Sequence, residues 1–156
     1  METTPDTELL GSIRAVIRLA RIAQQACEEA GLTLAQFRAL NSAAKGGQRA
    51  YELARSTAVS RPAVSALTNG MVRMGLIERG GSAEDGRGVL FSITDQGVET
   101  LRRAEELLVE RVREVLGESG DGAVRALSAL RVDEIEAALD AQALHDFGAR
   151  PHRPGR

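Results

Sequence analysis

Cysteine, tryptophan and histidine are almost missing from this chain of 156 residues, which holds one Cys, no Trp and two His. A single cysteine excludes an internal disulfide framework and any zinc site built on several cysteine ligands, as is usual in a reducing compartment. The two histidines, His145 and His152, are too few and too remote from any acidic cluster to form a metal site. We therefore expect neither a metal nor a cofactor.

Long apolar runs are also missing, since no stretch approaches the roughly 20 residues that a membrane-spanning helix needs. The N-terminus, Met-Glu-Thr-Thr-Pro-Asp, lacks the basic start and apolar centre of a signal peptide. A cytoplasmic protein with no membrane partner is expected. Apolar residues make up 43% and charged residues 27% of the chain, which is ordinary for a globular protein, and the length suits one domain.

Catalytic motifs are the third absence. The chain has no phosphate-binding glycine loop, no Gly-x-Ser-x-Gly elbow and no His-Glu-x-x-His pair. The neighbouring carboxylates Glu105 and Glu106, like Glu134 and Glu136, fall in charged helix surfaces that also carry arginine. An enzyme is therefore not expected.

Charge is distributed unevenly along the chain although the net charge is only −2. Residues 1–44 carry −1, residues 45–94 carry +3 and residues 95–156 carry −4. The middle segment is thus the one positive part, and positive charge is what a DNA-binding module needs.

Apolar spacing predicts long helices on both sides of this middle segment. Residues 7–29 repeat apolar side chains every three or four positions and end at Gly31, and a second helix is expected over 34–44 with Thr33 as N-cap. After the middle segment, Thr94 is the expected N-cap of a helix that runs to Leu116, and a last helix is expected over 123–144. The tail, residues 148–156, has too little apolar surface to fold and is expected to be disordered.

Two closely spaced helices are predicted within the positive segment. A short helix over 52–57 is separated by only Ala58 and Val59 from a longer one over 60–74, for which Ser60 is the N-cap and Gly75 the stop. So short a connection forces the helices to cross steeply, as in a helix-turn-helix. Leu76-Ile77 and Val89–Ile93 then flank a glycine-rich tip, which predicts a projecting β-hairpin.

One face of the longer helix is small and polar, whereas Val64 and Leu67 on the other face are suited to burial. Small outward side chains let a helix approach the base edges of the DNA major groove. The alternative is an ordinary surface helix in a helical enzyme. The side chains expected to point outward are Arg61, Ala63, Ser65, Ala66, Thr68 and Asn69.

The order of these motifs resembles the MarR family of bacterial winged helix-turn-helix regulators. Four stretches carry the resemblance: residues 32–40 (LTLAQFRAL), residues 52–65 with ELA and VSRPAVS, residues 74–79 (MGLIER), and Asp85-Gly-Arg87 leading to ITDQG at 93–97. Each stretch is weak alone, but the set in this order is specific. The resemblance implies a fold that is mainly α with a small β-hairpin wing, within one domain over residues 1–147.

The resemblance also implies where DNA binds. Residues 33–94 would form the winged-helix lobe, and residues 7–29 and 95–147 the helices of a homodimer. The segment from Ser60 to Asn69, Pro62 included, would read the major groove of double-stranded DNA, while Arg87 would enter the minor groove with Asp85 orienting its guanidinium. A solvated surface pair is the alternative for Asp85 and Arg87. The basic residues left to hold the DNA backbone are Lys45, Arg49, Arg55 and Arg73.

Two positions depart from the family pattern, because Gly86 and Ala66 stand where many members carry arginine. Fewer cationic contacts would weaken the dependence of binding on salt.

We expect a dimeric repressor of a pseudo-palindromic operator, released by a small-molecule effector that binds between the dimerisation helices and the lobe. The alternative is a winged-helix protein-interaction module that never binds DNA. For Cys27 we weigh a redox sensor against a buried structural cysteine, and its apolar neighbours on the helix and the acidic Glu28 favour burial.

Overall fold

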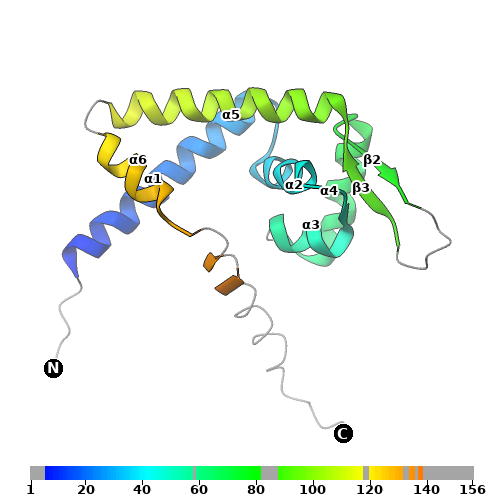
Figure 1. Cartoon of the computed structure of the whole chain (residues 1–156), viewed down its shortest axis with the longest axis horizontal. Helices are drawn as coiled ribbons and strands as arrows, with labels where there is room; N and C mark the ends of the chain where they lie inside the picture. Colours follow the sequence, from blue (N-terminus) through cyan, green and yellow to red (C-terminus); the bar gives the residue numbers. More distant parts are fainter. Residues whose placement is uncertain are drawn as a thin grey trace, which may run out of the picture. The chain divides into compact units, whose positions relative to one another are not determined.

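The computed structural model describes residues 6–57, 59–81, 88–117, 120–131, 134–135 and 137–138. Its helices are α1 (Thr7–Glu29), α2 (Leu34–Ala44), α3 (Ala50–Thr57), α4 (Arg61–Arg73), α5 (Asp95–Leu116) and α6 (Asp121–Ser128). Its strands are β1 (Gln48–Arg49), β2 (Ile77–Gly80) and β3 (Leu90–Ile93). The chain divides into two compact units, residues 1–115 and 116–156. Figure 1 colours these elements in chain order.

The first unit is built around the winged helix. Within it, α2, α3 and α4 gather beside the small sheet next to the N-terminal part of α5 (Figure 1). Their apolar faces share one core with the end of α1, where Cys27 lies, and with the first half of α5. The largest fully buried side chains in that core are those of Leu32, Leu40, Leu53, Met71 and Cys27.

Caps and stops occur where the sequence predicts them. Thr33 Oγ1 accepts from the Gln36 amide at 3.1 Å while the Gln36 side chain accepts from the Thr33 amide at 2.8 Å, which completes a capping box at the start of α2. Gly31 and Gly75 end α1 and α4 with positive φ angles of 79° and 70°, a conformation that favours glycine. The predicted helices over 7–29 and 34–44 are therefore confirmed.

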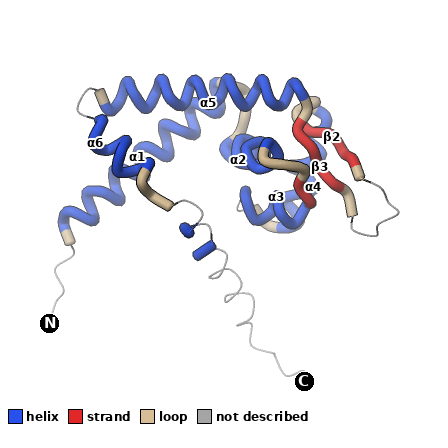
Figure 2. The backbone as a smooth tube through the Cα atoms, viewed as in Figure 1, coloured by secondary structure: helices blue, strands red, loops and turns tan. Residues whose placement is uncertain are grey.

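The sheet is antiparallel, with strand order β1-β3-β2. Figure 2 shows the paired strands β2 and β3. Ile77 pairs with Ile93 and Arg79 pairs with Phe91 between β2 and β3, so the predicted hairpin is confirmed. The sequence did not predict β1, whose Gln48 pairs with Phe91. This strand has only two residues, too few to show an alternating pattern. The fold class, mainly helical with a small β wing, is confirmed, but the sheet has three strands.

The start of α5 packs against the end of α4 and the start of β2. Thr94 Oγ1 accepts from the Gly97 amide at 3.0 Å, as expected of an N-cap, and donates to the Gly75 carbonyl oxygen at 2.6 Å. Gly97 leaves room for the backbone of the neighbouring segment, since a Cβ there would lie 2.1 Å from the carbonyl oxygen of Leu76. The helix that follows the wing is thus joined directly to the turn that ends α4.

The second unit corrects one expectation. The sequence predicts a single helix over 123–144, whereas α6 ends at Ser128 and a turn at Ala129 and Leu130 follows it. Backbone bonds to the Arg131 carbonyl oxygen then begin a new helical turn at Glu134 and Ile135. No glycine or proline marks this break, and the alanine and leucine around it favour helix, so the prediction was wrong here. The predicted tail, residues 148–156, lies outside the described residues.

Candidate nucleic-acid interface

The helix-turn-helix is formed by α3 and α4, which pack against each other through the core. Leu53 of α3 and Val64 and Met71 of α4 are buried, and the Thr57 hydroxyl donates to the Leu53 carbonyl oxygen at 2.5 Å, which satisfies it within α3. With one face of α4 buried in this way, the opposite face is left to solvent. The connection between the helices is as short as the sequence predicts.

The exposed face of α4 consists of short side chains and ends in a cation. Ser60 occupies the N-cap position, although its side chain makes no cap hydrogen bond, and the proline lies in the first turn. A surface of this kind can approach another surface closely, because few long side chains stand in the way. The predicted residues that the structure exposes are Ser60, Pro62, Ala63, Ser65, Ala66, Asn69 and Arg73.

Thr68 is a correction to the predicted face. Its side chain was expected to point outward, but the residue is only 3% exposed and its hydroxyl donates to the Val64 carbonyl oxygen at 3.0 Å. A threonine can satisfy its hydroxyl on the preceding helical turn in this way, which lets it sit among apolar neighbours. The polar type of the residue was a misleading guide to its orientation.

Of the remaining predicted cations, Lys45, Arg49 and Arg55 lie outside α4. Lys45 is exposed at the end of α2, and Arg55 is exposed on α3. Arg49 is half-buried in β1, where its backbone amide donates to Glu52 Oε2 at 2.6 Å and its Nη1 reaches the Gly88 carbonyl oxygen at 3.4 Å. It therefore connects β1 to the base of the wing. The side chain of Arg61 and the wing residues Asp85 and Arg87 lie outside the described residues.

A cleft of about 540 Å³ separates α4 from the wing. Its lining includes two arginines, Arg49 and Arg79, and its described lining contains no carboxylate. Arg79 Nη2 donates a hydrogen bond to Asn69 Oδ1 across ten residues of sequence. The residues that line the cleft come from β1, α3, α4, β2, β3 and the segment just before β3: Arg49, Ala50, Tyr51, Ser65, Thr68, Asn69, Arg79, Gly88, Val89 and Phe91.

Six residues of this cleft were not among the predicted site residues, and two of the six, Arg79 and Tyr51, have polar side chains. Arg79 was quoted only as part of a family motif, and Tyr51, which is 58% exposed at the start of α3, was not considered. The period of β2 offers a signal for Arg79, since Ile77 is buried and the residue two positions later lies on the same face of a strand. Nothing in the sequence indicates that Tyr51 and Arg79 line one cleft.

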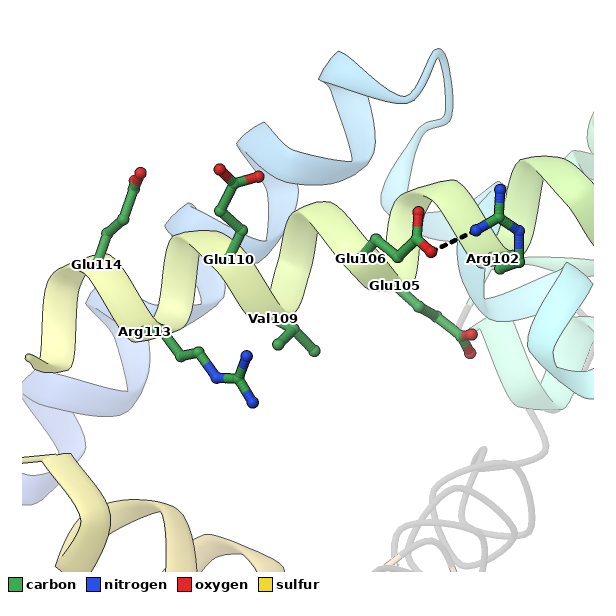
Figure 3. A pocket seen from close by; sticks show the side chains of 7 residues that line it. All are labelled: Arg102, Glu105, Glu106, Val109, Glu110, Arg113 and Glu114. Carbon is green, nitrogen blue, oxygen red and sulfur yellow. Dashed lines mark hydrogen bonds and ion pairs between the residues drawn. The ribbon is translucent and has the colours of Figure 1, made fainter.

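A second hollow, of about 630 Å³, lies along α5 (Figure 3). Glu105, Val109 and Arg113 point to one side of the helix, while Glu110 and Glu114 point to the other. An ion pair joins Arg102 to Glu99 at 2.5 Å, and another joins Arg102 to Glu106, so part of this charge is compensated within the helix. The hollow shares no residue with the cleft or with the exposed face of α4.

Membrane-spanning helices and metal-binding clusters are absent from the described residues. None of the helices in this part of the chain combines the length and the apolar character needed to cross a membrane. Among the same residues, His, Cys, Asp and Glu side chains do not gather in groups of three that could hold a metal ion.

The fold and the exposed α4 face define a winged helix-turn-helix protein. The MarR family model matches residues 30–88, which span α2, the helix-turn-helix and the first wing strand. The resemblance to the MarR family predicted from the sequence is therefore confirmed for this segment. No curated protein matches the sequence.

Solved structures extend the likeness beyond that segment. The transcriptional repressor CouR, bound to a 23-mer DNA duplex, is 29% identical with a TM-score of 0.61, over 83% of this chain and 97% of its own. A MarR family regulator from Rhodococcus sp. RHA1 is 15% identical with a TM-score of 0.69, over 87% and 96%. NadR in complex with 4-hydroxyphenylacetate is 23% identical with a TM-score of 0.62, over 87% and 98%. The chain thus has the fold of these regulators over most of its length.

Proposed function

We propose that the protein is a transcription regulator that binds double-stranded DNA in a sequence-specific manner as a homodimer. The observation that carries the proposal is the exposed face of α4, where short side chains such as those of Ser65 and Ala66 are followed by the exposed Arg73. A helix with such a face fits the major groove, which is about 12 Å wide. The net charge of +3 over residues 45–94 would favour the approach of DNA to this part of the chain.

The comparisons support this proposal at the level of the family. The match is to a family of transcription regulators rather than of enzymes. CouR was solved on DNA, and it is the most similar in sequence of the structures described above. By analogy, α4 would lie in the major groove of this protein's operator. Two copies related by a two-fold axis would read half-sites about one turn of DNA apart, and repression would follow from occupancy of the promoter.

The dimer would form through the long helices outside the winged helix. Along α1, five large apolar side chains are exposed in the isolated chain, and Ile17 is 63% exposed. A helix with an uncovered apolar face of this kind usually packs against a partner. The exposed apolar side chains of α1 are Leu9, Leu10, Ile13, Val16 and Ile17.

A small-molecule effector is part of the proposal. NadR was solved with 4-hydroxyphenylacetate, which supports a small molecule as the class of effector. Such a ligand would bind between the dimerisation helices and the lobe, and it would act only through its preference for one spacing of the two lobes over another. Asp85 and Arg87 keep their proposed role in the minor groove.

The experiment is a fluorescence-anisotropy titration with a duplex from the promoter beside the protein's own gene. Ala66→Glu places a carboxylate on the exposed face of α4, where it would repel DNA phosphates, and we expect a loss of affinity of at least about tenfold. Ala15→Glu is the matched control, because Ala15 is also an exposed helical alanine but lies on α1, away from its apolar face. The control should bind as the wild type does.

Equal affinities of the two variants would contradict the placement of α4 on DNA. Failure of the wild type to bind any duplex specifically at low salt would favour the other function expected from the sequence, a winged-helix module that binds a protein partner.

A further inference from the structure

The hydrogen bond between Arg79 of β2 and Asn69 of α4 fixes the orientation of an amide on the face proposed to read DNA. Arginine carries only donors, so the atom of Asn69 that faces Arg79 must be the carbonyl oxygen and not the amino group. The Asn69 amino group is then the part of the amide left for another partner. Asn69 itself is exposed, one helical turn before Arg73.

The fold holds Arg79 at this position. Its strand pairs with β3, with Arg79 opposite Phe91, and the residue two positions earlier, Ile77, is buried in the core. Ser65, Thr68 and Asn69 form the α4 side of the cleft, and no carboxylate in its described lining competes for the guanidinium. The backbone of Arg79 is therefore held in the wing by strand pairing, while its side chain bonds to Asn69 of α4.

The engaged carbonyl changes which bases Asn69 can recognise. A free asparagine pairs with adenine through two bonds, accepting from N6 and donating to N7. Arg79 takes up one of the two lone pairs of the oxygen and sets its positive guanidinium beside it, which disfavours a second donor such as adenine N6 at that oxygen. Guanine instead offers two acceptors, N7 and O6, to the free amino group. Cytosine presents a donor there, which an amino group cannot pair with.

We propose that Arg79 is a specificity-determining residue, which makes Asn69 read DNA through its amino group and select guanine over adenine. The inference rests on the proposed function, since it assumes that α4 lies in the major groove. Arg79 acts through Asn69 and is therefore a positioning residue, distinct from the cations that hold the DNA backbone.

The test is selection of duplexes from a randomised library by the full-length protein at fixed salt, followed by sequencing. The base pair that faces residue 69 is identified as the one whose preference disappears in Asn69→Ala. We expect guanine at that pair with the wild type, and a shift of about tenfold toward adenine with Arg79→Met, which frees the amide oxygen. Methionine is shorter than arginine but retains an unbranched apolar stem, which favours folding.

Two further variants distinguish an effect of Arg79 on base preference from a general effect on DNA affinity. In the double variant Asn69→Ala/Arg79→Met the shift toward adenine should vanish, because the effect passes through the amide. Arg73→Met, the matched control, removes an exposed arginine one turn further along α4 and should weaken all duplexes alike without changing the preferred base. Circular dichroism of each variant confirms that it is folded.

The outcomes distinguish the two proposals. If the wild type enriches no sequence, the proposed function fails and this inference fails with it. If the wild type enriches a site but Asn69→Ala leaves every preference intact, or Arg79→Met leaves the preference for guanine unchanged, DNA binding stands and the role of Arg79 is overturned.

Discussion

At the scale of single residues, the Cys27 thiol shows how burial sets chemistry. The residue is fully buried near the end of α1, as its place on the apolar stripe predicts. Burial raises the pKa of the thiol, and the negative charge of Glu28 raises this pKa further. Only the thiolate reacts readily with oxidants, so both effects oppose the redox-sensor alternative and favour a structural role.

The raised pKa of Cys27 predicts how stability depends on pH. Below the pKa of an unfolded cysteine, about 8.5, both states keep the proton and pH has no effect through this group. Above it, the unfolded chain loses the proton while the folded protein keeps it. The free energy of unfolding should then fall, by up to about 1.4 kcal/mol per pH unit. Urea unfolding at pH 7, 9 and 10 measures this slope.

Cys27→Ala is the control for that slope, because it removes the titrating group and changes little in volume. The variant's free energy of unfolding should decrease less steeply between pH 8.5 and 10 than that of the wild type. Identical pH slopes in the two proteins would show that the thiol titrates equally in both states, contrary to its burial.

The same scale explains which site residues the sequence could predict. The 3.6-residue period places Ser65, Ala66 and Asn69 on one face of α4, and the structure exposes all three. Thr68 was misplaced because its hydroxyl bonds to its own helix, an option that side-chain polarity does not reveal. The contact of Arg79 with Asn69 joins two different elements. It depends on tertiary packing, which has no local signature.

At the scale of elements, helices with clear caps and stops were predictable, whereas the strand β1 and the end of α6 were not. The capping box at Thr33 and the glycines that end α1 and α4 mark boundaries by a direct physical requirement of the backbone. The two-residue strand β1 exists because β3 offers it a partner, and the end of α6 at Ser128 has no such mark. Local sequence therefore predicts an element whose own residues supply its caps and stops, but not one that depends on a partner elsewhere in the chain.

The junction between β2 and α5 depends on the absence of a side chain at Gly97. A Cβ there would lie 2.1 Å from the Leu76 carbonyl oxygen and 2.8 Å from Ile93 Cγ1, and the first of these is backbone that cannot move aside cheaply. Gly97→Ala should therefore reduce the free energy of unfolding by about 1–3 kcal/mol or more, as overpacking does elsewhere. Urea denaturation followed by circular dichroism measures the loss.

Gly11→Ala is the matched control for Gly97→Ala, since both glycines lie in helices but a Cβ at Gly11 meets nothing within 4 Å. In this open position alanine should stabilise the helix slightly, by about 0.5–1 kcal/mol, because it costs less backbone entropy than glycine. If the two substitutions changed stability alike, the close approach of β2 to α5 would not be the reason for glycine at position 97.

At the scale of the whole molecule, the exposed apolar side chains lie outside the winged helix as well as within it. The exposed apolar side chains of α1 form one face of that helix. On α6, Val124 and Leu127 are exposed. The core residues of the winged helix, in contrast, are buried. A homodimer would bury these uncovered apolar side chains. The proposed DNA binding needs that dimer, because each copy offers one α4 to a half-site.

The α1 face predicts the effect of a charge on assembly. Ile13 and Ile17 are 45% and 63% exposed in the single chain, so Ile13→Asp/Ile17→Asp should not disturb the core of the lobe. Buried in a dimer, the two carboxylates would lie in an apolar interface without partners, at a cost of several kcal/mol. We expect the wild type to sediment as a dimer and this variant to sediment as a folded monomer at the same concentration, with weaker operator binding.

Arg18→Asp is the control for this pair, because it also introduces a carboxylate on exposed α1 but on the side opposite to the apolar face. It should remain dimeric and bind DNA nearly as the wild type does. A monomeric Ile13→Asp/Ile17→Asp variant that bound the operator with undiminished affinity would separate DNA binding from assembly, and the paired half-site arrangement would have to be abandoned. A variant that stayed dimeric would instead place the interface elsewhere on the chain.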